Sequence, residues 1–106
     1  MTQFRVHHLV EQEYREARTW YADRSPLAAE NFAIRFSHAL SSLEQPPRKR
    51  PYWRKPFRRI RLVRFPYLLL YHENEVTISV LALVHERREP TSTFLSLAQR
   101  TKRWRE

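Results

Sequence analysis

The chain has 106 residues and a formal net charge of +9, a length that accommodates one domain with one hydrophobic core. It contains no cysteine and no glycine, which excludes a disulfide scaffold, a thiolate metal site and the glycine-rich loops that hold nucleotide phosphates. No apolar stretch approaches the roughly 20 residues that span a bilayer, and no signal peptide is recognisable, so we expect a single cytoplasmic domain over residues 1–106, with no membrane segment, metal or cofactor.

The first half of the chain predicts a strand followed by two helices. Phe4 and Val6 alternate with polar residues over 3–7, a period of two that is typical of a strand. Residues 9–24 carry apolar side chains at helical spacing, and Ser25 with Pro26 then forms a helix start, because serine caps and proline fits the first position. The two helices are so close in sequence that we expect an antiparallel pair. The second helix has one apolar face, formed by Ala29, Phe32, Phe36, Ala39, Leu40 and Leu43.

Three strands are predicted in the second half. Residues 57–65 alternate, and residues 67–72 are apolar throughout, as expected of an inner strand covered on both faces. In the turn at 73–75, Asn74 is the residue best able to adopt a positive φ. The last strand, 75–87, ends before Pro90, and a short C-terminal helix follows.

The order β-α-α-β-β-β predicts an α+β fold. A helix hairpin would pack on one face of a mostly antiparallel four-stranded sheet. In this arrangement Arg59 and Arg61 point away from Ile60, and Leu81 and Leu83 share a strand face with His85.

The positive charge is concentrated in one segment. Residues 45–72 contain nine Lys and Arg and no acidic residue, whereas residues 1–44 carry five basic and six acidic residues and residues 73–106 carry six and five. Such a segment favours polyanions or acidic protein partners, and a solvated surface is the alternative. Trp53 lies among these cations and is a candidate to stack on a base or to anchor a protein, with packing against the second helix as the alternative.

Three segments in a fixed order resemble one known family. Trp20-Tyr21, FPYLLLY at 65–71 and VLALVHERREP at 80–90 resemble the RelE/ParE superfamily of bacterial toxins, also known as plasmid stabilisation proteins, over nearly the whole chain. The resemblance implies the toxin of a type II toxin–antitoxin system, a growth inhibitor held in a hetero-oligomer by its antitoxin. It also implies two different targets. ParE-like members inhibit DNA gyrase by binding it, whereas RelE-like members cut messenger RNA on the ribosome.

The resemblance implies four catalytic residues if the chain is a metal-independent endoribonuclease. Alignment on the tyrosine of the central strand places Arg59 and Arg61 where RelE has two functional lysines, and Arg87 near a catalytic arginine. Such cations could stabilise the charge of the reacting phosphate. His85 is expected to share a face with Arg87 and can titrate near neutrality, whereas a hydrogen-bonded or exposed strand-end histidine is the alternative.

Two positions depart from the nuclease pattern. Leu68 stands where RelE has a second catalytic arginine, and Thr93 stands where it has a functional tyrosine. Neither Thr93 nor the adjacent Phe94 can transfer a proton usefully. These losses favour a ParE-like toxin that acts by binding gyrase. The alternatives are a RelE-like nuclease and a non-toxic basic domain that binds nucleic acid or serves as an adaptor.

Two sets of binding residues are expected. Apolar side chains ringed by cations would suit an acidic antitoxin peptide that folds on contact, although a C-terminal segment folded over the leucines is the alternative. The expected antitoxin-binding residues are Leu81, Leu83, Arg87 and Arg88. The expected RNA- or target-binding residues are Trp53, Arg54, Lys55, Arg58, Arg59, Arg61 and Arg64.

Overall fold

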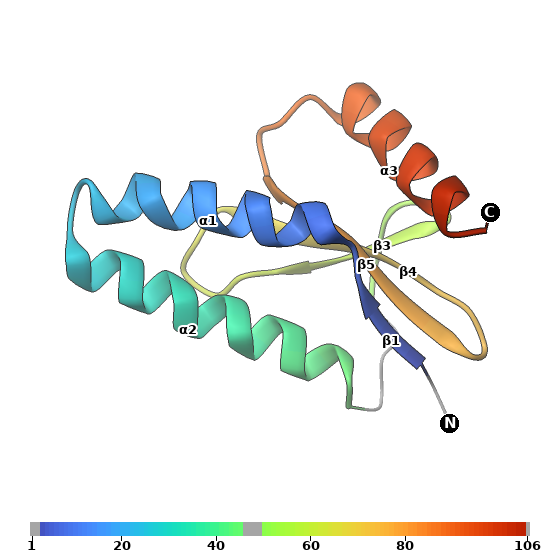
Figure 1. The fold of residues 1–106 in the computed structure, drawn as a ribbon, viewed down its shortest axis with the longest axis horizontal. Helices are drawn as coiled ribbons and strands as arrows, with labels where there is room; N and C mark the ends of the chain where they lie inside the picture. Colours follow the sequence, from blue (N-terminus) through green and yellow to red (C-terminus); the bar gives the residue numbers. More distant parts are fainter. Residues whose placement is uncertain (1–2, 46–49, 106) are drawn as a thin grey trace.

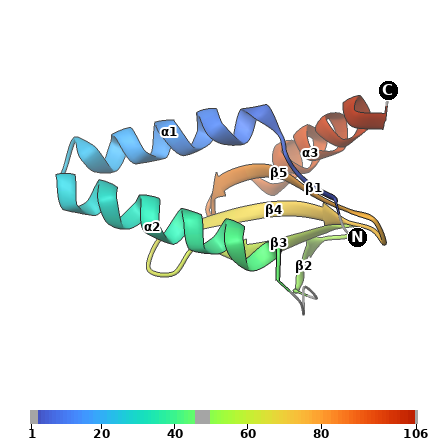
Figure 2. The same cartoon turned by 60° about the horizontal axis from the view of Figure 1, so that its bottom comes forward.

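A mixed sheet of five strands lies between a helix pair on one face and a single helix on the other in the computed structural model, which describes residues 3–45 and 50–105 (Figure 1). The strand order is β1-β5-β4-β3-β2, with β1 parallel to β5 and all other pairs antiparallel. Figure 2 shows α1 and α2 together on one side of the sheet and α3 on the other. The elements are β1 (Gln3–Val6), α1 (His8–Ala22), α2 (Pro26–Leu43), β2 (Tyr52–Arg54), β3 (Phe57–Arg61), β4 (Tyr67–Glu73), β5 (Thr77–His85) and α3 (Pro90–Arg105).

The predicted α+β order is confirmed, with two differences in the sheet. The expectation of four strands was wrong, because β2 adds a fifth strand by pairing with β3. This strand is only three residues long and lies between prolines, too short for an alternating pattern to be visible. The last strand was expected to reach Arg87 but ends at His85, so Arg87 lies in the turn that follows.

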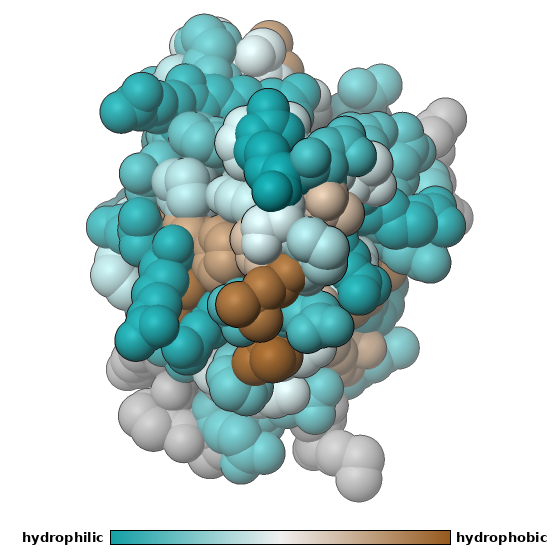
Figure 3. All heavy atoms as spheres, turned by 90° about the vertical axis from the view of Figure 1, so that its left-hand side faces the viewer, coloured by the Kyte–Doolittle hydropathy of each residue, from teal (hydrophilic) through white to brown (hydrophobic). Residues whose placement is uncertain are grey.

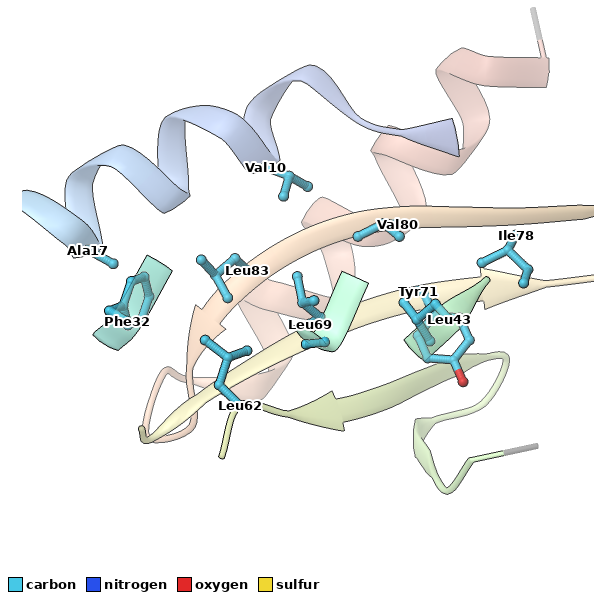
Figure 4. Packing of buried hydrophobic residues seen from close by; sticks show 11 residues of the cluster. Val10, Ala17, Phe32, Leu43, Leu62, Leu69, Tyr71, Ile78, Val80 and Leu83 are labelled. Atoms are coloured by element: carbon cyan, nitrogen blue, oxygen red, sulfur yellow. The ribbon is translucent and has the colours of Figure 1, made fainter. Parts of the chain in front are cut away.

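The helix hairpin begins and packs as its sequence predicts. The Ser25 hydroxyl accepts a hydrogen bond from the Ala28 N–H at 3.3 Å, and Pro26 occupies the first helical position. Phe32 is fully buried against Tyr21 and Phe65, and the centroid of each of these rings lies 5.2 Å from the Phe32 centroid. Figure 4 shows Phe32 in the cluster between the hairpin and the sheet.

A bulge in β5 divides its apolar side chains between the two faces of the sheet. The register with β4 shifts between Leu70 and Tyr71. Ile78 and Val80 before the shift, and Leu83 after it, face the helix hairpin. Leu81 and Ala82, at the shift, pack on the opposite side of the sheet against α3, where they contact the cluster of Leu97 and Phe94. Because a bulge adds one residue to a strand, strict alternation fails beyond it. The expectation that Leu81 and Leu83 share a face was therefore wrong.

Side chains from two helices complete the hydrogen bonding along one side of β5. β1 pairs with β5 only as far as Val80. Beyond it, the Leu83 N–H donates to Glu13 Oε1 of α1 at 3.1 Å, and the Leu81 carbonyl accepts from Arg100 Nη1 of α3 at 2.6 Å. Arg100 and Glu13 also pair with each other at 3.0 Å, and both side chains are only 15% exposed. One ion pair therefore links α1, β5 and α3.

The two turns of the β3–β4–β5 meander use different devices. Asn74 was expected to adopt a positive φ, but its side-chain oxygen instead accepts hydrogen bonds from Val76 N–H at 2.9 Å and Thr77 N–H at 2.8 Å. An asparagine side chain that bonds the backbone in this way holds a turn without a left-handed residue. Among the described residues, Arg64 alone has a positive φ, of 71°, in the β3–β4 turn.

A carboxylate caps the start of α3. Glu89 accepts hydrogen bonds from the backbone N–H of Thr91 at 2.8 Å and of Ser92 at 2.7 Å, so its side chain satisfies two of the helix's free N-terminal donors. The hydrogen bond from Ser92, followed by that from Thr91, lowers the pKa of Glu89 to about 2. Pro90 then begins the helix instead of ending the preceding strand.

We predict that Glu13→Ala destabilises the fold by about 3 kcal/mol, because it leaves the largely buried Arg100 guanidinium without its counter-charge and the Leu83 N–H without its acceptor. The measurement is the free energy of unfolding in urea. Glu11→Ala is the matched control, since Glu11 also lies on α1 and pairs with Arg15, but both side chains are more than 60% exposed. The control should change stability by no more than about 0.5 kcal/mol, and equal losses in the two variants would contradict the structure.

We predict that the stabilisation supplied by Glu89 depends on pH. Its pKa in the folded state, about 2, lies below its ordinary value of 4.5, so its contribution is present above about 4.5 and is lost as the pH falls toward 2. The difference in unfolding free energy between the wild type and Glu89→Gln, measured from pH 7 down to pH 2, should shrink over this window. A difference that stays constant across the range would show that the carboxylate does not cap α3.

Candidate functional site

The four candidate catalytic residues do not form one cluster. In the sheet register, Arg61 pairs with Leu68, and Leu68 pairs with Val84. Leu68 and Val84 both pack under α3, so the Arg61 side chain leaves the backbone on the α3 face of the sheet. His85 pairs with Tyr67, whose ring packs with the core under the helix hairpin, so His85 lies on the hairpin face. Because paired residues on adjacent strands share a face, the sheet separates His85 from Arg59. The longer Arg61 side chain instead reaches the end of the sheet, where it lines a pocket with Arg35 and His38 of α2 and its guanidinium pairs with Glu86.

His85 is engaged in structural contacts. Its ring lies edge-to-face on Tyr67, with centroids 5.3 Å apart, and its Nδ1 accepts a hydrogen bond from the Arg87 backbone N–H at 3.1 Å. This contact holds the turn after β5, which matches the expectation of a hydrogen-bonded histidine at a strand end. Burial raises the pKa of Tyr67, so the neighbouring phenol holds its proton more tightly than an ordinary tyrosine. Arg87 is exposed in the turn.

The arginines of β3 differ in how their charge is balanced. Arg61 Nε pairs with Glu86 Oε2 at 3.0 Å. Arg58 Nε lies 3.8 Å from a Glu73 oxygen, and its guanidinium donates to the Tyr52 hydroxyl at 3.0 Å. Arg59 is half-buried, and within residues 3–45 and 50–105 it forms no ion pair.

The two positions that depart from the nuclease pattern are part of the core. Leu68 is 8% exposed and packs in the cluster under α3. Thr93 is 3% exposed, and its hydroxyl donates to the Glu89 carbonyl at 2.9 Å within the first turn of α3. Both side chains therefore serve packing and helix structure.

Cations gather along the β2–β3 edge of the sheet. Arg54 and Lys55 lie at the turn that joins β2 to β3, Arg58, Arg59 and Arg61 lie on β3, and Arg64 lies in the turn before β4. We call these six residues the basic edge. Arg54, Lys55 and Arg64 are exposed, and no carboxylate in the described part of the chain pairs with them. Of the basic stretch found in the sequence, residues 46–49 lie outside the described residues.

The two aromatic residues of β2 are already in contact with cations. The ring centroid of Tyr52 lies 4.1 Å from the Arg58 guanidinium carbon and 5.2 Å from the Lys55 nitrogen. Trp53 is half-buried against the cluster under α3, and the Arg54 guanidinium lies 6.0 Å from its ring centroid. Trp53 therefore packs on the α3 side of the sheet, and not against the second helix as the alternative had it.

The leucines expected to bind the antitoxin are both buried. Leu81 is 0% exposed and lies beneath Leu97 of α3, as the alternative of a folded-back C-terminal segment predicted. Leu83 is 3% exposed, but it lines a groove on the hairpin face. The expected open apolar pocket containing both leucines is therefore wrong for this structure, because the β5 bulge turns them to opposite faces.

The groove that Leu83 lines lies between α1 and the ends of β4 and β5, with a volume of about 360 Å³. Trp20 stands at its wall, 49% exposed, with the Arg24 guanidinium 3.4 Å from its ring centroid. Arg24 also donates to the Trp20 carbonyl at 2.7 Å, so the ring is held in place. The lining residues are Glu13, Glu16, Ala17, Trp20, Tyr67, Leu83, Val84, His85 and Arg88.

Sequence reasoning did not identify this groove. Its walls come from α1 and from the end of the meander, and no sequence spacing connects the two. The one available signal was the position of Trp20, a large aromatic next to the apolar stripe of its helix and outside it.

The helix hairpin also exposes apolar side chains. Leu27 is 65% exposed and Ile34 is 50% exposed, and their spacing of seven residues places them on one side of α2. Figure 3 views the end of the molecule where α1 and α2 meet and shows brown, hydrophobic side chains gathered within a mostly hydrophilic surface. Apolar patches on a protein surface commonly mark contacts with other proteins.

The described residues offer no site for a metal ion, since no three His, Asp or Glu side chains among them come together. No helix within residues 3–45 and 50–105 has the length and apolar character needed to cross a membrane.

Comparison with known proteins identifies one family. The model of the ParE toxin of the type II toxin–antitoxin system parDE matches residues 4–90. A solved structure described as the chromosomal ParDE TA system from P. aeruginosa is similar in fold, with a TM-score of 0.69 and 16% sequence identity. The similarity covers 80% of this chain and 96% of that one. The comparison with curated proteins gave no match.

Proposed function

We propose that this chain, which belongs to the ParE toxin family of type II toxin–antitoxin systems, inhibits growth by binding DNA gyrase and not by cutting RNA. The observation that carries the proposal is the separation of the candidate catalytic residues by the sheet. RNA cleavage through the 2′-hydroxyl needs proton-transfer groups and cations around one phosphate. His85 on the hairpin face and Arg59 on the α3 face do not meet this requirement, and the Arg61 guanidinium is held by Glu86.

The state of the individual residues supports the same conclusion. Arg61 is paired with Glu86, and His85 Nδ1 is occupied by the Arg87 backbone. The positions of the remaining nuclease residues hold a buried leucine and a buried threonine. A binding mechanism requires none of these groups, and the exposed apolar side chains of α2 are the kind of surface that protein partners cover. A gyrase inhibitor of this kind acts in the cytoplasm.

We further propose that the chain is held by a cognate antitoxin, as the described ParDE system implies for its own toxin. The groove beside Trp20 suits an apolar anchor of the antitoxin, because Leu83 and Tyr67 line its floor. Arg88 lines the groove and Arg87 is exposed beside it, so both can pair with carboxylates of the same peptide. The proposed antitoxin-binding residues are therefore Leu83, Arg87 and Arg88, as predicted from the sequence, with Trp20 in place of Leu81.

We predict that His85→Ala leaves gyrase inhibition unchanged, because His85 carries no chemistry in a binding mechanism. The measurement is supercoiling of relaxed plasmid by purified gyrase with increasing toxin, next to messenger RNA cleavage on purified ribosomes. Removal of a general base or acid would lower cleavage by about 10²- to 10⁴-fold. Ribosome-dependent cleavage by the wild type that disappears in His85→Ala would establish the nuclease instead. A wild type that affects neither gyrase nor ribosomes would support the non-toxic basic domain.

We predict that Trp20→Ala weakens antitoxin binding by about 30-fold or more, the effect expected of a rigid aromatic anchor at an interface. The dissociation constant is measured by isothermal titration calorimetry with the antitoxin that is encoded beside the toxin gene. Tyr52→Ala is the matched control, since Tyr52 is a similarly exposed aromatic residue on the far edge of the sheet. Equal effects of the two substitutions, or none, would place the antitoxin elsewhere.

A further inference from the structure

We infer that the basic edge binds the phosphate backbone of duplex DNA, and that in the inhibited complex it contacts the DNA that gyrase holds. The first part stands on the basic edge alone. The second part rests on the proposed function and extends it, since the toxin would then bridge the enzyme and its DNA.

The charge of the basic edge is available to a ligand. Of its six cations, only Arg58 and Arg61 have carboxylate partners within residues 3–45 and 50–105. Arg54, Lys55, Arg59 and Arg64 have none there. Four unbalanced charges along one edge create a local positive potential that attracts a polyanion and speeds its association.

The helix hairpin does not compete for a polyanion. Residues 1–44, which form β1 and the helix hairpin, carry five basic and six acidic residues. Most of the acidic side chains of α1 and α2 are exposed, including Glu11, Glu16 and Glu30. A polyanion approaching the molecule is therefore attracted to the β2–β3 edge and not to the hairpin.

The spacing of the four unbalanced cations fits a duplex. They extend from the β2–β3 turn at Lys55 to the β3–β4 turn at Arg64, at opposite ends of β3. At about 3.3 Å per residue, β3 with its flanking turns spans roughly 20 Å. This length corresponds to about six base pairs of B-DNA, at about 3.4 Å per phosphate on each strand. Because each strand winds around the duplex axis, a straight row of cations of this length meets phosphates on both sides of a groove.

The aromatic side chains favour a duplex over a single strand. Proteins that bind single-stranded nucleic acid stack bases on open aromatic rings. The ring of Tyr52 faces Arg58 and Lys55, and Trp53 is half-buried under α3, so neither ring is an open stacking platform. A duplex keeps its bases stacked internally and presents phosphates, which require only the cations.

The first test measures the binding of the toxin to a fluorescein-labelled 25-base-pair DNA duplex by anisotropy at several salt concentrations. Four phosphate contacts give a slope of log K against log salt of about −3.6, and removal of two of them should reduce its magnitude by about 1.8. Arg54→Gln/Lys55→Gln and Arg59→Gln/Arg64→Gln should each show this reduction. Arg15→Gln/Arg18→Gln on α1 lowers the net charge equally and should leave the slope unchanged.

Equal slopes for the edge and control variants would show that binding follows net charge and would overturn the inference. Tighter binding of single-stranded RNA than of the duplex would overturn it as well. Arg54 and Lys55 are exposed turn residues, so their double substitution tests the inference even if the substitution of Arg59 disturbs the sheet.

The second test measures inhibition of gyrase supercoiling by the same variants. The edge variants should need at least several-fold more toxin than the wild type, whereas the control variant should not. If the edge variants inhibit as well as the wild type, the bridging role is wrong and gyrase inhibition stands. If the wild type does not inhibit gyrase at all, the proposed function fails, and the anisotropy measurement still decides whether the basic edge binds DNA.

Discussion

The unpaired side of β5 is the constraint on which the arrangement of the helices depends. β5 is the most buried strand, yet its parallel neighbour β1 ends opposite Val80. Backbone groups buried without partners are costly, so the remaining donor and acceptor must be satisfied from elsewhere. Glu13 supplies one partner from α1, and Arg100 supplies the other from α3. The pairing of these two side chains fixes both helices against the same strand, and burial of either charge alone would be unfavourable.

This arrangement creates the two separate surfaces to which we assign binding partners. With α1 held against the end of β5, the groove beside Trp20 and Leu83 forms on the hairpin side. With α3 held over the opposite face, the leucines of the second cluster are covered, and the β2–β3 edge beside them remains open and charged. A groove lined by aromatic and aliphatic groups suits a protein anchor, whereas a row of cations suits phosphate. The two proposed partners can therefore bind without competing for the same residues.

The sequence was sufficient for every element except β2 and insufficient for the faces of β5. Helix starts depend on local chemistry, which is why Ser25 and Pro26 were identified from sequence alone. The faces of β5 depend on the bulge opposite Leu70, a feature of pairing with β4 that no spacing in either strand reveals. One inserted residue left Leu81 on the α3 side and moved Leu83 and His85 to the hairpin side, which separated His85 from Arg59. Residues such as Glu13 and Arg100, 87 positions apart in sequence, meet only in the folded chain.

The parallel pairing of β1 with β5 also determines when the toxin becomes complete. Gln3 pairs with Thr77, so the first strand of the chain has no neighbour in the sheet until the last strand has been synthesised. Contacts of such large sequence separation form late, because a long loop must be closed before they contribute any stability. While the chain is still on the ribosome, the helix hairpin can form locally, but the sheet that supports it cannot close. A chain that terminates before β5 would thus lack the complete sheet, the groove and the ion pair. The folded toxin can therefore form only after β5 and α3 have been synthesised.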